Sequence, residues 1–268
     1  MRRRTRFGLL SGAIGLGIIG TTAMTAEATT YEGGVSFSKV VFNNGKPIVV
    51  GTTNEVSVPL TFTVKSTSAL AEWEVFAYRG TLGSSDYTLA SGETQLSCSK
   101  STSDGVTTRN CKWNISVDPR HMPSGNGGSL VNSDATAWKT AGRGFKTSGS
   151  VDTDGLSGTV SLQRYSRLTA NASPEPAVKG GKITVTGVVQ RADWSAHTYV
   201  NYGGRTVYLQ FKPAGSDTYT SVKSVTASST GKLSTTVTAD RSGTWRWKYY
   251  GNSTTGASTS TGDSVTVG

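Results

Sequence analysis

Apolar and polar residues alternate over short stretches along most of this sequence. Every second residue is apolar from Val56 to Val64, which places five apolar side chains on one face of an extended strand. The following stretches show the same period or a strand-like composition: 35–42, 73–77, 113–117, 135–141 and 159–165. Because a single sheet would leave its apolar face uncovered, these stretches predict a β-sandwich of about seven strands.

The second half of the chain repeats this pattern. Alternating strands are expected near residues 183–185, 207–211, 233–237, 245–249 and 265–267. Trp245 and Trp247 alternate with Arg246 and Lys248, so we expect both tryptophans in a core. No stretch beyond residue 28 has the 3.6-residue period of an amphipathic helix. The pattern therefore predicts a second antiparallel sandwich.

The first 28 residues have the pattern of an export signal. Four arginines precede an apolar run over residues 7–19, and Ala26-Glu27-Ala28 offers a small-residue cleavage site. A membrane anchor would need about 20 apolar residues, whereas this run is short and interrupted by glycines. We expect residues 1–28 to be removed during general secretion and the mature protein to be released without stable membrane insertion.

The two cysteines are expected to form a disulfide. If Asp104-Gly105 forms a two-residue type I′ hairpin loop, Ser103 faces Val106 and Cys98 faces Cys111. The cysteines then occupy a non-hydrogen-bonded pair, where facing side chains approach most closely. An oxidising exterior favours the bridge.

Several segments resemble a known family. The stretches that carry the resemblance in the second half are 168–176, 180–187, 207–211 and 243–247; those in the first half are 45–51, the cysteine pair and 118–120. The second half looks like the immunoglobulin-like domain of small secreted actinobacterial proteins, and the first resembles the domain of unknown function that precedes it. The resemblance implies two immunoglobulin-like sandwiches in tandem, over residues 29–166 and 167–268, without an assigned activity.

The junction between the two domains lacks a flexible linker. Residues 165–171 contain no Gly/Ser run, and Pro174 and Pro176 stiffen the next few residues of the chain. We expect the domains to be held end to end with limited bending.

The charge of the mature chain is positive. The signal holds four of the 27 basic residues and one of the 17 acidic ones, so 23 and 16 remain, a net charge of +7. Outside the cell this excess favours anionic cell-wall polymers over nucleic acid, and a basic surface without a dedicated partner is the alternative. An extracellular protein partner also remains open.

Calcium binding is a further alternative, because some members of the resembled family carry a calcium-binding label. Asp152 and Asp154, before Gly155, resemble the opening of an EF-hand loop, but the third carboxylate and the closing Glu are missing. An Asx turn explains the same residues without metal. We therefore expect no metal site and no cofactor.

Catalysis has little support in the sequence. His121 and His197 are the only imidazoles, and neither lies in a recognisable nucleophile motif. We expect no catalytic residues, and a secreted hydrolase of unrecognised type is the second alternative.

A cluster of aromatic and basic residues in one loop is the candidate binding site. It comprises Arg191, Trp194, His197, Tyr199, Tyr202 and Arg205. Exposed aromatic side chains with polar neighbours stack on sugars or anchor protein partners. Alternatively, Trp194 folds back as a lid over the end of the sandwich core. The sequence thus predicts a secreted, non-catalytic binding or structural protein of the cell exterior.

Overall fold

The computed structural model describes residues 26–27, 34–83, 87–90, 97–121 and 128–268. Almost all ordered segments in these ranges are β-strands, and the helical ones are the single 3-10 turns η2 (Asn43–Gly45) and η4 (Asn132–Asp134). No helix in the described ranges is long and apolar enough to cross a membrane. The all-β prediction is confirmed.

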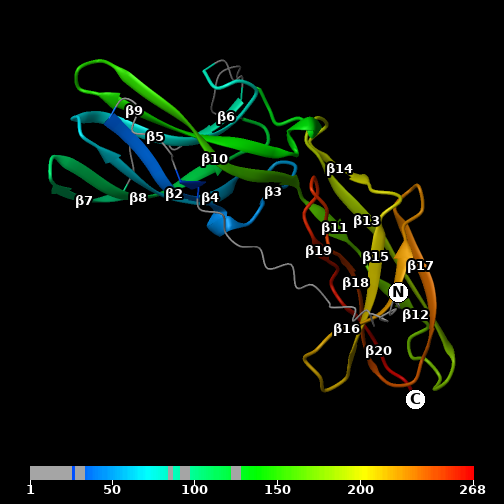
Figure 1. Cartoon of the computed structure of the whole chain (residues 1–268). Helices are drawn as coiled ribbons and strands as arrows, with labels where there is room; N and C mark the ends of the chain where they lie inside the picture. Colours follow the sequence, from blue (N-terminus) through cyan, green and yellow to red (C-terminus); the bar gives the residue numbers. More distant parts are fainter. Residues whose placement is uncertain (1–25, 28–33, 84–86, 91–96, 122–127) are drawn as a thin grey trace, which may run out of the picture.

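The first domain is a sandwich of two five-stranded sheets (Figure 1). One sheet has the order β1 (Ala26–Glu27), β2 (Val35–Phe42), β4 (Val56–Ser66), β8 (Val106–Val117) and β7 (Ser97–Ser103). The other has the order β3 (Ile48–Val50), β10 (Val151–Arg164), β9 (Ala137–Lys146), β5 (Leu70–Arg79) and β6 (Tyr87–Ala90). Strand β3 pairs in parallel with β10, and the other pairs are antiparallel. The main strands follow the A-B-E-D and G-F-C orders of an immunoglobulin-like sandwich.

The first core lies between these sheets and follows the predicted alternation. Val58, Leu60, Phe62 and Val64 of β4 are all buried in it, around the fully buried Trp138 of β9. The sandwich has more strands than the seven expected, because β1, β3 and β6 are too short to show a period of their own. The two residues of β1 lie within the predicted signal, so cleavage after Ala28 would remove this strand.

The second domain is a smaller sandwich with the same organisation. Its first sheet contains β12 (Asn171–Ser173), β13 (Lys182–Asp193) and β17 (Lys232–Thr238), with β11 (Ser166–Leu168) and β14 (Thr198–Asn201) on the far half of β13. Its second sheet contains β16 (Thr220–Thr226), β15 (Thr206–Pro213), β18 (Gly243–Tyr249) and β19 (Ser258–Thr259), with β20 (Asp263–Val265) beside β18. Trp245 and Trp247 are buried between the sheets, as predicted.

The disulfide forms on the predicted register. Asp104 and Gly105 have positive φ angles of 50° and 75°, as a type I′ turn requires, and Ser103 faces Val106. Cys98 and Cys111 face each other with their Cα atoms 4.1 Å apart and are bonded. The bridge therefore ties β7, the edge strand, to β8.

We predict that replacing both cysteines by alanine lowers the free energy of unfolding by roughly 2–4 kcal/mol, because the bridge restricts the unfolded chain. Chemical denaturation of the two proteins measures this difference. The unreduced wild-type protein should contain no alkylatable thiol by mass spectrometry. Two free thiols, or an unchanged denaturation midpoint, would contradict the bridge.

Candidate functional site

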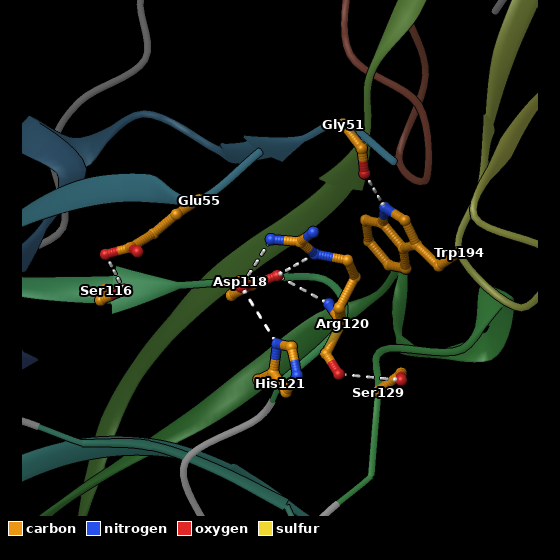
Figure 2. Close-up of polar contacts among 8 residues, drawn as sticks. All are labelled: Gly51, Glu55, Ser116, Asp118, Arg120, His121, Ser129 and Trp194. Atoms are coloured by element: carbon orange, nitrogen blue, oxygen red, sulfur yellow. Dashed lines mark hydrogen bonds and ion pairs between the residues drawn. The ribbon is translucent and has the colours of Figure 1, made fainter. Parts of the chain in front are cut away.

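Trp194 belongs to the second domain but is buried in the core of the first. Its side chain is 0% exposed and packs in the same hydrophobic cluster as Val50 and Trp138. The indole Nε1 donates to the carbonyl of Gly51 at 2.9 Å, a contact drawn in Figure 2. The expectation that Trp194 stands exposed for stacking is wrong. The lid alternative holds, although the core that Trp194 closes is that of the neighbouring domain.

Asn132 fixes the segment around Trp194 by hydrogen bonds. Its amide oxygen accepts from the Trp194 backbone N–H at 3.0 Å, and its amide nitrogen donates to Asp193 Oδ1 at 2.9 Å. The donation from Asn132 lowers the pKa of Asp193 and outweighs the opposing effect of burial. Side chains of the first domain thus hold both the backbone and the carboxylate of the Trp194 turn.

The end of β10 forms the second half of this joint. The backbone N–H of Arg164 donates to Thr254 O at 3.0 Å, and the N–H of Gly256 donates back to Arg164 O at 2.9 Å. A Cβ on Gly256 would lie 2.7 Å from the Val49 side chain, so only glycine fits here without a shift. The loop at 251–257 therefore extends the last strand of the first domain. Joint here means Trp194, Asn132, the end of β10 and this loop.

We predict that Trp194→Ala destabilises the first domain by about 3–5 kcal/mol, the usual cost of truncating a buried tryptophan. Urea denaturation should show this loss. Small-angle scattering should show a wider distribution of domain arrangements in the variant. Trp194→Phe, which keeps much of the apolar volume, should lose less stability. An unchanged scattering profile and midpoint for Trp194→Ala would refute a structural role at the joint.

A group of arginines surrounds Tyr202 beside the joint. The guanidinium carbons of Arg191 and Arg205 lie 4.2 and 4.9 Å from the centre of the Tyr202 ring, within cation–π range. Arg164 is 7% exposed, and neither its Nε nor that of Arg191 has a hydrogen-bond partner among the described residues. Burial lowers the pKa of Arg164, and nearby Arg191 lowers it further. The cluster concentrates positive charge at this end of the second domain.

Two tyrosines in contact with this charge have shifted pKa values. Burial alone would raise the pKa of Tyr202, but hydrogen bonds from Thr255 and Asn252 and the charge of Arg191 lower it to about 8. Burial raises the pKa of Tyr249 above its ordinary range, and Tyr202 raises it further. The two rings meet edge to face with centroids 6.0 Å apart, yet the Tyr249 hydroxyl has no hydrogen-bond partner among the described residues.

We predict that one tyrosine of the native protein ionises near pH 8 and that Tyr202→Phe removes this step. Near-ultraviolet absorbance of the phenolate measures it. Because the pKa in the folded state is below the ordinary value of 10, this group stabilises the fold at high pH. Its contribution to the free energy of unfolding should grow from pH 7 to 10 and vanish as pH falls through 8. Ionisation only near pH 10 would contradict the described cluster.

A groove lies beside this cluster on the second domain. It has a volume of about 480 Å³ and runs between the start of β15 and the end of β18. The groove is lined by Gly204, Arg205, Thr206, Tyr208, Tyr249, Tyr250, Gly251 and Asn252. Its lining contains aromatic rings, an arginine and an amide but no carboxylate.

The other loop residues predicted to bind take separate positions. Tyr199 is half-buried against the first core and meets Tyr165 edge to face at 6.3 Å, with Arg167 stacked 3.9 Å from its ring centre. His197 has a left-handed φ of 49° and a buried Nδ1 without a partner in the described part of the chain. The predicted cluster is thus divided between the joint, with Trp194 and Tyr199, and the groove side, with Tyr202 and Arg205.

His121 takes part in a separate polar turn after β8. Asp118 accepts hydrogen bonds from the backbone and side chain of Arg120, and its Oδ2 lies 3.3 Å from His121 Nδ1 (Figure 2). Burial opposes these contacts, but together they lower the pKa of Asp118 to about 2. Ser129 Oγ, also in Figure 2, donates to the Arg120 carbonyl. The His121 side chain is 79% exposed, so these contacts describe a stable surface turn.

Asp152 and Asp154 do not lie in a loop. Both belong to β10, where they pair with Gly144 and Gly142, and Asp152 lies 3.9 Å from Lys146 Nζ. Both the EF-hand-like loop and the Asx turn expected here are therefore wrong. Among the described residues, no three His, Cys, Asp or Glu side chains gather in a way that could hold a metal ion.

Sequence reasoning missed Arg164 and the residues at the end of β18. Arg164 and Tyr249 occupy positions that alternation assigns to strands, and Tyr250 and Asn252 follow in a turn. Their significance arises only when β15 and β18 pair and the 251–257 loop meets β10. The only signal in the sequence is the aromatic run Trp245-Trp247-Tyr249-Tyr250, which continues past the strand into the turn.

Comparisons with known proteins supply no family for this chain. No family model matches it, and no curated protein matches it in sequence. Among solved structures, the fibronectin(III)-like modules of Clostridium thermocellum CbhA align over 85% of this chain and 92% of theirs, with 11% identity and a TM-score of 0.33. The D00–D0 domain of Intimin aligns over 84% and 98%, with 17% identity and a TM-score of 0.27. The mouse nectin-like molecule 4 ectodomain aligns over 85% and 64%, with 12% identity and a TM-score of 0.27. Scores this low transfer neither a family nor a function.

Proposed function

We propose that this chain is an exported, non-catalytic protein of the cell exterior that binds cell-wall polysaccharide through a rigid pair of β-sandwiches. The observation that carries the proposal is the joint, where Trp194 of the second domain completes the core of the first. A shared core holds the two domains in one orientation, as a spacer or presenting module requires. The disulfide and the predicted signal support an extracellular location.

The positive charge of the mature chain supports an anionic wall polymer as the partner. Exposed lysines and arginines raise the local concentration of polyanions and make their binding depend on salt. Calcium gains no support, because Asp152 and Asp154 lie in a strand with Lys146 beside Asp152. No described contact gives His121 a nucleophile, so the hydrolase alternative gains no support either.

We predict that the mature protein, purified from the culture medium, sediments with isolated cell walls at low ionic strength and is released by salt. Excess chelator should leave the bound fraction unchanged. Secretion should be checked by mass spectrometry of the N-terminus. A protein that stays in the cytoplasm with an intact N-terminus, or that fails to sediment with walls, would contradict the proposal. Loss of binding with chelator would favour the calcium alternative, and capture of a wall protein alone would favour a protein partner.

A further inference from the structure

We propose that the groove between β15 and β18 binds a segment of carboxylate-bearing polysaccharide, with Tyr208 and Tyr250 as the stacking surface and Arg205 and the Tyr249 hydroxyl as the polar contacts. This inference rests on the proposed function and assigns its binding site. The groove volume of about 480 Å³ lies within the roughly 300–1,000 Å³ of small-ligand sites.

The aromatic part of the groove is a corner of two rings. Tyr208 and Tyr250 meet edge to face with centroids 5.1 Å apart, and Tyr250 is 55% exposed. A large ring held by a neighbouring ring loses little conformational entropy on binding. Sugar rings present apolar C–H faces that pack against such surfaces. Tyr250 thus offers an exposed platform, which the buried Trp194 does not.

The charge of the groove favours an anion. Arg205 lines it, and the Lys248 Nζ lies 5.0 Å from the Tyr250 ring centre. The only hydrogen bond of the Arg205 guanidinium within the described residues runs from Nε to Gly203 O at 3.3 Å, so its terminal amino groups remain free for a carboxylate. No lining residue is acidic. A neutral glycan would leave this charge uncompensated.

The floor of the groove contains an unsatisfied donor. Tyr249 lines the groove and is only 4% exposed, and its hydroxyl has no hydrogen-bond partner among the described residues. Buried hydroxyls in native proteins nearly always have a partner, and leaving one unpaired is costly. A ligand oxygen in the groove would supply the missing acceptor. The hydroxyl is therefore assigned to ligand recognition and not to packing.

The test uses the full mature protein and an oligogalacturonate as probe, titrated by calorimetry, with a neutral galacto-oligosaccharide of equal length and free sulfate as comparators. We expect binding of the oligogalacturonate that is at least about tenfold tighter than binding of either comparator, because stacking and charge act together. Equal affinity for the neutral sugar, equal affinity for sulfate, or no binding at all would overturn the inference.

Tyr249→Phe separates recognition from structure. It removes only the unpaired hydroxyl, so the melting temperature should stay the same or rise while affinity for the oligogalacturonate falls about tenfold. Unchanged affinity, or a falling melting temperature with unchanged affinity, would assign the hydroxyl to packing and overturn this part of the site.

Tyr250→Ala and Arg205→Gln should each weaken binding by about tenfold or more. The matched controls are Tyr165→Ala, an exposed tyrosine outside the groove, and Arg241→Gln, an exposed arginine elsewhere on the same domain. Both controls should bind like the wild type. Equal losses in variants and controls would overturn the assignment of the groove.

The wall assay distinguishes this inference from the function it rests on. If wild-type protein sediments with walls and the groove variants do so equally well, the groove assignment fails and the wall-binding function stands. If the protein binds oligogalacturonate through the groove but does not sediment with walls, the site stands and the proposed location of its ligand fails.

Discussion

The burial of Trp194 across the domain boundary is the contact on which the arrangement of the molecule depends. The first sandwich is open at the end where β3 stops and the chain leaves β10, and Trp194 from the β13–β14 turn fills that opening. The indole N–H satisfies the Gly51 carbonyl, which would otherwise be buried without a donor. Because each domain contributes to the same core, neither end of the joint is complete without the other.

This joint also determines where charge accumulates. Gly256 lets the 251–257 loop approach Val49 and extend β10, and this brings Arg164 close to Arg191 and Tyr202. Like charges placed together repel unless they are screened or paired. Here the Tyr202 ring and the carboxylate of Asp193 lie among them, and the lowered pKa of Tyr202 records that compensation. A further anion would relieve the remaining repulsion.

Local patterns were enough to predict most of the fold. The strict alternation in β4 and β18 located their core faces, and the Asp104-Gly105 turn fixed the register that joins Cys98 to Cys111. Such features depend on neighbours in the sequence. The candidate site does not, because residues at positions 50, 132 and 194 meet only after both domains have folded. Sequence periodicity contains no information on which of two cores an apolar loop residue enters.

The aromatic residues show why this distinction matters for function. An aromatic side chain outside the strand alternation has two physical outcomes: it either covers a core opening or remains exposed to bind a partner. Trp194 took the first outcome because an unfilled opening lay within reach of its turn. Tyr250 follows the last core position of β18, with Tyr208 on the paired strand beside it, and no opening lies there for it to fill. Its exposure is therefore the remaining outcome, and the unpaired hydroxyl of the adjacent Tyr249 points to the same surface as the place where a ligand completes the structure.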